Sequence, residues 1–297
     1  MPKKDQEQLP TQNCLLVIES IVRTSKPIVV LVGEKVFQRS DLYDIVAYGM
    51  AFGLKMIIEA LPSELSIDVL RRFSPFGPRV FRVLLNGCII EDPSTRYRQS
   101  REFSALTDCV QRLKSAGYEV HLSAIVTSSN LRELAFYHDY AIRCGARGIY
   151  YHLWRPAFVP QDEPRNADKV VDAICRMKHF SPKEMYVSPQ CVRYTVSLVE
   201  THGGGYQIGS SNESNLCCSH LCLGGKTFAF INVDGTVQVC KAMPTVCGNL
   251  LFDHYDFQKL WNSSSVFQYL RENQYTCTKT RSALMYLRDN QQAEVVS

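Results

Sequence analysis

Helical and strand patterns alternate along the first half of the chain, and this alternation limits the fold more than any other feature. Stretches with helical periodicity, such as "NCLLVIESIVRT" and "SDLYDIVAYGMAFG", each precede a short apolar run, such as "KPIVVLV" and "LKMIIEAL". The pattern continues to residue 154 and gives five expected strands. Because parallel strands need crossover helices, the sequence predicts an α/β fold, either a barrel or an open sheet covered by helices.

Composition excludes several classes of protein. The 297 residues are 45% hydrophobic, which is enough for a large core. The net charge of +4 arises from 33 basic and 29 acidic residues spread along the chain, so we expect no nucleic-acid partner. The polar start has no signal-peptide apolar region, and no run approaches the ~20 apolar residues of a membrane span. We therefore expect a cytoplasmic protein without a membrane partner.

A stretch rich in Gly and Ser, "THGGGYQIGSSNESN", divides the chain. Its composition predicts a domain boundary, with an α/β domain over residues 1–202 and a smaller extension over 203–297. Within the extension, Asp234-Gly235 lies between two β-rich runs, which predicts a β-hairpin. A helical stretch with a break near its serines follows, so we expect an α+β extension.

Cysteines gather around the predicted hairpin, where Cys222 precedes the first strand and Cys240 ends the second. In a reducing compartment, clustered thiols indicate metal binding more often than disulfides. Paired thiolates on a glycine-turned hairpin suit an iron-sulfur cluster or zinc. His220 is either a ligand of a mixed zinc site or an exposed loop histidine. Five other cysteines are expected to be ordinary buried residues: Cys88, Cys109, Cys144, Cys175 and Cys191.

The C-terminal third resembles the SPASM or twitch extension of radical S-adenosylmethionine (radical SAM) enzymes. The shared pattern is a cysteine, a "DG" turn, a second cysteine, "GNL" and a helix with a tryptophan. Here these are Cys222, Asp234-Gly235, Cys240, Gly248-Asn249-Leu250 and Trp261-Asn262. The resemblance implies an auxiliary [4Fe-4S] cluster with Cys222 and Cys240 as ligands. The further candidate ligands are Cys277, Cys217, Cys218 and Cys247.

The first two thirds resemble the radical SAM core, a partial (β/α) barrel. "PIVVLVGEK" is similar to the strand and "GGEP" motif that bind S-adenosylmethionine, and Gly33 and Glu34 remain from that motif. "IVTSSNLREL" is similar to a segment that places Asn130 at the family's asparagine. The resemblance implies that Gly33, Glu34 and Asn130 lie near S-adenosylmethionine. Glu34 is either a remaining ligand for its amino group or a solvated carboxylate.

The family's C-x3-C-x2-C loop, which holds the catalytic [4Fe-4S] cluster, has no counterpart in this sequence. Cys14 is the only cysteine before Gly33, and it lies in an expected helix. The family's "SLDG" is here Leu84-Leu85-Asn86-Gly87. Five strands are expected where the family has six, so the first strand is expected to be missing from a truncated or degenerate chain. The polar N-terminus, a missing segment or a partner protein is then expected to cover the first sheet edge.

Without three convergent thiolates, we do not expect this chain alone to cleave S-adenosylmethionine. The resemblance implies the family's role, the modification of a peptide, tetrapyrrole or cofactor precursor, and therefore a peptide or small-molecule substrate. Three functions stay open. They are a radical SAM/SPASM-like protein with an auxiliary cluster, an inactive pseudoenzyme that binds a substrate or partner enzyme, and a zinc-stabilised structural module.

Overall fold

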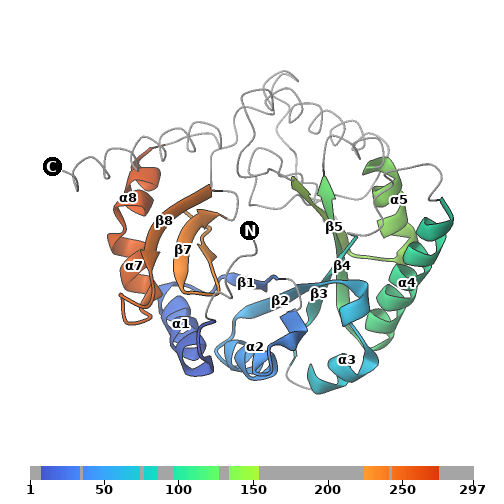
Figure 1. The fold of residues 1–297 in the computed structure, drawn as a ribbon, viewed down its shortest axis with the longest axis horizontal. Coiled ribbons are helices and arrows are strands. Elements are labelled where there is room, and N and C mark those ends of the chain that lie inside the picture. The colour runs from blue at the N-terminus through green and yellow to red at the C-terminus, as the bar shows by residue number, and fades with distance from the viewer. Residues whose placement is uncertain are drawn as a thin grey trace, which may run out of the picture.

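The computed structural model describes residues 8–33, 36–73, 77–85, 96–126, 134–153, 224–240 and 243–273. Its elements form two groups (Figure 1). The first group consists of α1 (Thr11–Thr24), β1 (Ile28–Leu31), α2 (Leu42–Ala51), β2 (Lys55–Ala60), α3 (Ile67–Phe73), β3 (Val80–Leu84), α4 (Arg96–Ser115), β4 (Glu119–Val126), α5 (Leu134–Cys144) and β5 (Gly148–Leu153), with short 3-10 turns at Val36–Gln38 and Pro62–Glu64. The second group consists of β6 (Phe230–Ile231), β7 (Thr236–Cys240), β8 (Met243–Asn249), α7 (Phe257–Ser263) and α8 (Ser265–Glu272).

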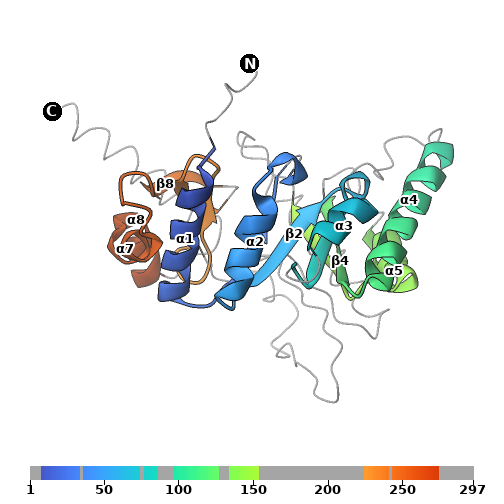
Figure 2. The same ribbon diagram turned by 90° about the horizontal axis from the view of Figure 1, so that it is seen from below.

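The first group forms a five-stranded parallel sheet in the order β1-β2-β3-β4-β5. Figures 1 and 2 show the sheet curving like part of a barrel, with α2, α3, α4 and α5 along its outer side. The prediction of an α/β fold with five parallel strands is confirmed. Within the described residues, no helix is long and apolar enough to cross a bilayer.

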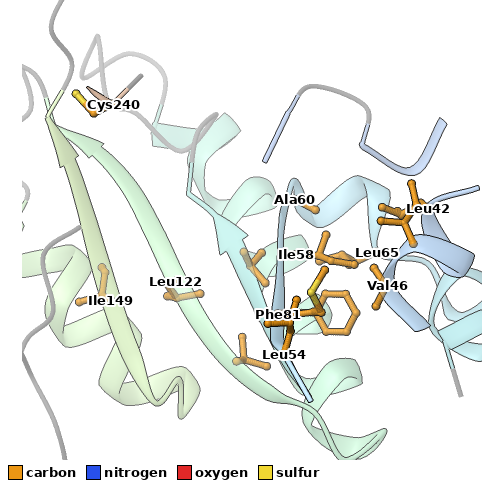
Figure 3. Packing of buried hydrophobic residues seen from close by; sticks show 14 of the residues in the cluster. Leu42, Val46, Leu54, Ile58, Ala60, Leu65, Phe81, Leu122, Ile149 and Cys240 are labelled. Carbon is orange, nitrogen blue, oxygen red and sulfur yellow. The ribbon is translucent and has the colours of Figure 1, made fainter. Parts of the chain in front are cut away.

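The main core lies between this sheet and the outer helices. Alternate strand residues such as Met56, Ile58 and Phe81 point outward and are at most 2% exposed. Figure 3 shows Leu42 and Val46 of α2 facing the core residues of the sheet. The intervening strand positions therefore face the interior of the partial barrel. Of the five cysteines expected in the core, Cys109 and Cys144 are confirmed as buried. The other three, Cys88, Cys175 and Cys191, lie outside the described residues.

Strand β1 forms one end of the sheet in the described part of the chain. Its side chains are only partly buried, and Ile28 is 58% exposed, whereas β2 is largely buried. The expected apolar edge strand is therefore present. What covers this edge stays a prediction.

The second group contains an antiparallel sheet in the order β6-β7-β8. Gly235 has a φ of +80° in the turn between β6 and β7, and the Asp234 side chain accepts a hydrogen bond from Thr236 N at 3.0 Å. The predicted hairpin is confirmed, as is a break between two helices at Ser264. Strand β8 was not predicted, because "MPTVCGN" contains a proline and a glycine and has no clear alternation.

Helix α1 connects the two groups by packing against both α2 and α7. Ser20 donates a hydrogen bond to Asp256 Oδ1 at 2.8 Å, and Asn13 Nδ2 donates to Tyr255 Oη at 2.6 Å. Just before the helix, Leu9 N donates to Val233 O at 2.9 Å. The N-terminal residues therefore contact the extension directly. The boundary near residue 202 lies outside the described residues and stays a prediction.

Asp256 stabilises both the start of α7 and its contact with α1. Its Oδ1 accepts hydrogen bonds from Lys259 N at 3.0 Å and from the buried Ser20. We expect Asp256→Ala to lower the free energy of unfolding by about 1–2 kcal/mol, because it removes a helix cap and the acceptor for Ser20. The control is Asp68→Ala, which removes an exposed ion pair with Arg71 and should change the free energy of unfolding by less than ~0.5 kcal/mol. Urea unfolding measures both effects. Equal effects of the two substitutions would contradict this role.

Buried His138 and largely buried His121 should make the stability of the barrel depend on pH. Burial lowers the pKa of His121 in β4, although Glu119 opposes the shift, and burial also lowers the pKa of His138 in α5. The unfolded chain takes up these protons near pH 6.5 and the folded chain takes them up only at lower pH, so this stability is complete above pH ~6.5 and is lost as the pH falls.

We expect the free energy of unfolding to fall by about 1–2 kcal/mol between pH 7 and pH 5.5. Urea unfolding of the wild type and of His138→Phe at both pH values measures this effect. The variant should show the smaller fall, and an identical fall would contradict the assignment to His138.

Candidate functional site

The paired strands β7 and β8 bring two of the predicted ligands into one buried region. Cys240 is the last residue of β7 and is 4% exposed, and Cys247 lies within β8 and is 9% exposed. The strands pair Cys240 with Met243 and Gln238 with Val246, and an irregularity separates these pairs. In Figure 3, Cys240 lies apart from the side chains that fill the sheet core.

The two cysteines interact electrostatically. Burial raises the pKa of the Cys247 thiol to about 12, and the neighbouring Cys240 adds to this rise. Cys247 is therefore a neutral thiol at pH 7 unless a cation compensates its negative charge. Metal ions and iron-sulfur clusters bind thiolates and provide this compensation, so the two residues fit such a group.

The "GNL" segment holds β8 in place next to Cys247. A Cβ atom on Gly248 would lie 2.7 Å from Leu260 Cδ1, so the absence of a side chain lets β8 approach α7 closely. Asn249 Nδ2 donates to Thr236 Oγ1 at 3.3 Å, and Leu250 N donates to Gly235 O at 2.9 Å. These contacts tie the end of β8 to the start of β7.

Trp261 and Arg271 join the helices to the segment that follows Cys222. The Trp261 ring packs on Phe267 with ring centres 4.8 Å apart, and the Arg271 guanidinium lies 4.6 Å from the centre of the Trp261 ring. Arg271 Nε donates to Gly225 O at 2.8 Å. Sequence reasoning missed Arg271, because an arginine in an amphipathic helix gives no signal of a specific contact.

The structure places one of the other predicted site residues but does not test its role. Gly33 is exposed just after β1, and a Cβ atom there would contact nothing within 4 Å. The remaining predicted residues lie outside the described residues: Glu34, Asn130, Cys217, Cys218, His220, Cys222 and Cys277. Within the described part of the chain, no group of three or more His, Cys, Asp or Glu side chains could hold a metal ion. The full ligand set therefore stays a prediction.

Comparison with known proteins supplies independent evidence for this region. The family model of SPASM, an iron-sulfur cluster-binding domain, matches residues 222–281. The AdoMet-dependent heme synthase of Methanosarcina barkeri is 22% identical over 273 residues, which cover 89% of this chain and 76% of the relative. The mycofactocin maturase MftC of Mycobacterium tuberculosis is 24% identical and is matched over 92% of this chain and 67% of its own.

Among solved structures, Streptococcus suis SuiB bound to the precursor peptide SuiA has a similar fold. The TM-score is 0.59 at 11% sequence identity, and the match covers 91% of this chain and 62% of SuiB. The chain thus spans about three fifths of the SuiB chain. The similarity extends over both the parallel sheet and the extension.

Proposed function

Because this chain is a radical SAM protein with a SPASM extension, we propose that its residues 222–281 hold an auxiliary [4Fe-4S] cluster. The observation that supports this proposal best is the pair of buried cysteines, Cys240 in β7 and Cys247 in β8, inside the matched segment. Cys222, Cys240 and Cys277 would be ligands, and the fourth would be Cys247 or one of Cys217 and Cys218. The cluster would supply electron transfer.

This chain's residues would position and shield the cluster. Gly248 lets β8 pack against α7, and Val237, Val239 and Cys240 of β7 are all buried. Arg271 fixes the backbone at Gly225, three residues after Cys222 in the sequence, through a hydrogen bond to Gly225 O. A water-poor, fixed arrangement of thiolates is what an iron-sulfur protein uses to tune the reduction potential.

A peptide is the substrate class that we propose. The structure of SuiB, which has a similar fold, contains a precursor peptide. The heme synthase relatives support a tetrapyrrole as the second candidate. Gly33, Glu34 and Asn130 would face S-adenosylmethionine if this chain binds it, but no S-adenosylmethionine cleavage is assigned, since the sequence has no C-x3-C-x2-C motif.

The test of the cluster is the iron, zinc and acid-labile sulfide content of anaerobically purified protein. About four iron and four sulfide ions per chain would support the proposal. Stoichiometric zinc would instead indicate a structural zinc module, and the absence of both metals would favour a pseudoenzyme. Calorimetric titration with linear peptides and with a tetrapyrrole then separates the two substrate classes.

A further inference from the structure

A group of polar side chains lies on the interior face of the five-stranded sheet, opposite the helix-covered core. It consists of Glu59 of β2, Arg82 of β3, His121 and Ser123 of β4, and Tyr150 of β5. Strand pairing places Glu59 beside Arg82, Arg82 beside His121, and Ser123 beside Tyr150. Four adjacent strands therefore contribute to one continuous patch, which we call the lumen site.

Charges within the lumen site are already balanced. Arg82 is 6% exposed, and its Nη1 lies 3.3 Å from Glu59 Oε2. Ser123 donates a hydrogen bond to the same oxygen at 3.1 Å. The Arg82 guanidinium lies 3.8 Å from the centre of the Tyr150 ring, and the His121 ring stacks on Tyr150 with centres 5.4 Å apart. The site thus combines the ion pair of Arg82 and Glu59 with an aromatic surface.

Among the residues that the structure describes, the buried atoms Arg82 Nε and His121 Nδ1 of the lumen site have no hydrogen-bond partner. His121 Nε2 lies 2.7 Å from Glu119 Oε1, and because a carboxylate only accepts, Nε2 carries the proton. Burial also lowers the pKa of His121, which keeps the ring neutral at pH 7. Arg82 Nε is therefore an unused donor, and His121 Nδ1 is an unused acceptor.

The chemistry of these two atoms selects among ligands. Buried polar atoms in native proteins nearly always have partners, so an unused pair indicates a group that binds there. A carboxylate has no donor for His121 Nδ1, and Arg82 already has a carboxylate partner in Glu59. A ketone or ester also lacks the donor. An amide is neutral and carries both a donor and an acceptor.

We propose that the lumen site binds an amide group of the substrate, whose carbonyl accepts from Arg82 Nε and whose N–H donates to His121 Nδ1. This inference deepens the proposed function, because a peptide substrate carries such amides. It involves none of the cysteines, so it can be tested separately from the cluster.

Three small probes of nearly equal shape test the proposal on the wild-type protein: acetamide, acetone and acetate. Nuclear magnetic resonance of ¹⁵N-histidine-labelled protein reports hydrogen bonding at His121 Nδ1, and His121→Phe assigns the signal. We expect a saturable shift with acetamide, and at least roughly fivefold weaker binding of acetone and acetate, since a buried acceptor left unpaired is costly. Equal or tighter binding of acetone or acetate would overturn the amide assignment. Absence of any saturable shift would show that ordered water completes the site.

Two conservative variants locate the interaction. Arg82→Lys keeps a cation beside Glu59 but removes Nε, and His121→Phe keeps a ring beside Tyr150 but removes Nδ1. Each should weaken acetamide binding by roughly fivefold or more, while Arg71→Lys, at an exposed arginine of α3, should not change it. Iron content should be unchanged in all three variants, so loss of the cluster and loss of amide binding are distinguishable. If Arg82→Lys does not fold, the comparison of probes on the wild type still decides the question.

The source of the amide is either a peptide bond or a side-chain carboxamide. N-methylacetamide reproduces a peptide bond, whereas acetamide reproduces a carboxamide. Binding of N-methylacetamide at least as tight as that of acetamide assigns a backbone amide. Weaker binding assigns a carboxamide side chain.

Discussion

Replacing Cys240 with serine is expected to remove the iron, the sulfide and the visible absorbance from anaerobically purified protein. Cys240 is a buried residue at the end of β7 within the segment that matches an iron-sulfur cluster-binding domain. Cys240 would be one of the four thiolate ligands of this cluster, so we expect the iron content of the variant to fall to below about a tenth of the wild-type value. Iron analysis and the visible spectrum of the two proteins measure this effect.

Cys109→Ser is the matched control, because Cys109 is equally buried but lies in α4 under the parallel sheet. This variant should keep its iron. Cys247→Ser identifies the fourth ligand, since loss of iron in this variant would assign that role to Cys247 rather than to Cys217 or Cys218. Full iron content in Cys240→Ser would show that Cys240 is not a ligand of the cluster.

Gly248→Ala is expected to destabilise the extension by about 2–3 kcal/mol, because its Cβ atom would lie 2.7 Å from Leu260 Cδ1 and 2.9 Å from Leu260 Cγ. Leu260 is buried in α7 and has little room to move. The new methyl group must therefore push β8 away from the helix, and Cys247 moves with it. We expect iron content to fall along with stability, measured by urea unfolding and iron analysis of the same preparation.

The control for this substitution is Val246→Thr in the same strand. Val246 is exposed, and threonine keeps the β-branched shape, so the free energy of unfolding should change by less than ~0.5 kcal/mol. If Gly248→Ala were as stable as this control, the close approach of β8 and α7 would not be needed to form the extension.

Most of the barrel could be predicted from the sequence, because apolar runs such as "LKMIIEAL" differ clearly from the amphipathic helices between them. The hairpin at Asp234-Gly235 could be predicted for a similar reason, since this dipeptide adopts the backbone conformation of tight turns. Strand β8 could not, because its proline and glycine hide the strand pattern and its position depends on contact with Leu260.

The candidate site was predictable only as a set of residue types. Cysteine spacing indicated Cys240 and Cys247, but their proximity depends on the register and irregularity of β7 and β8, which no spacing rule supplies. The lumen site had a readable signal, because Glu59 and Arg82 interrupt otherwise apolar strands at positions that face away from the core. Its unused donor and acceptor become visible only in three dimensions.

The central claim is an auxiliary [4Fe-4S] cluster in the extension, and Mössbauer spectroscopy of ⁵⁷Fe-labelled protein purified without oxygen tests it most directly. The account predicts the diamagnetic signal of a [4Fe-4S] cluster in the wild type and its loss in Cys240→Ser. A wild-type protein that contains zinc and no cluster iron, or one whose cluster signal is unchanged in Cys240→Ser, would contradict the account.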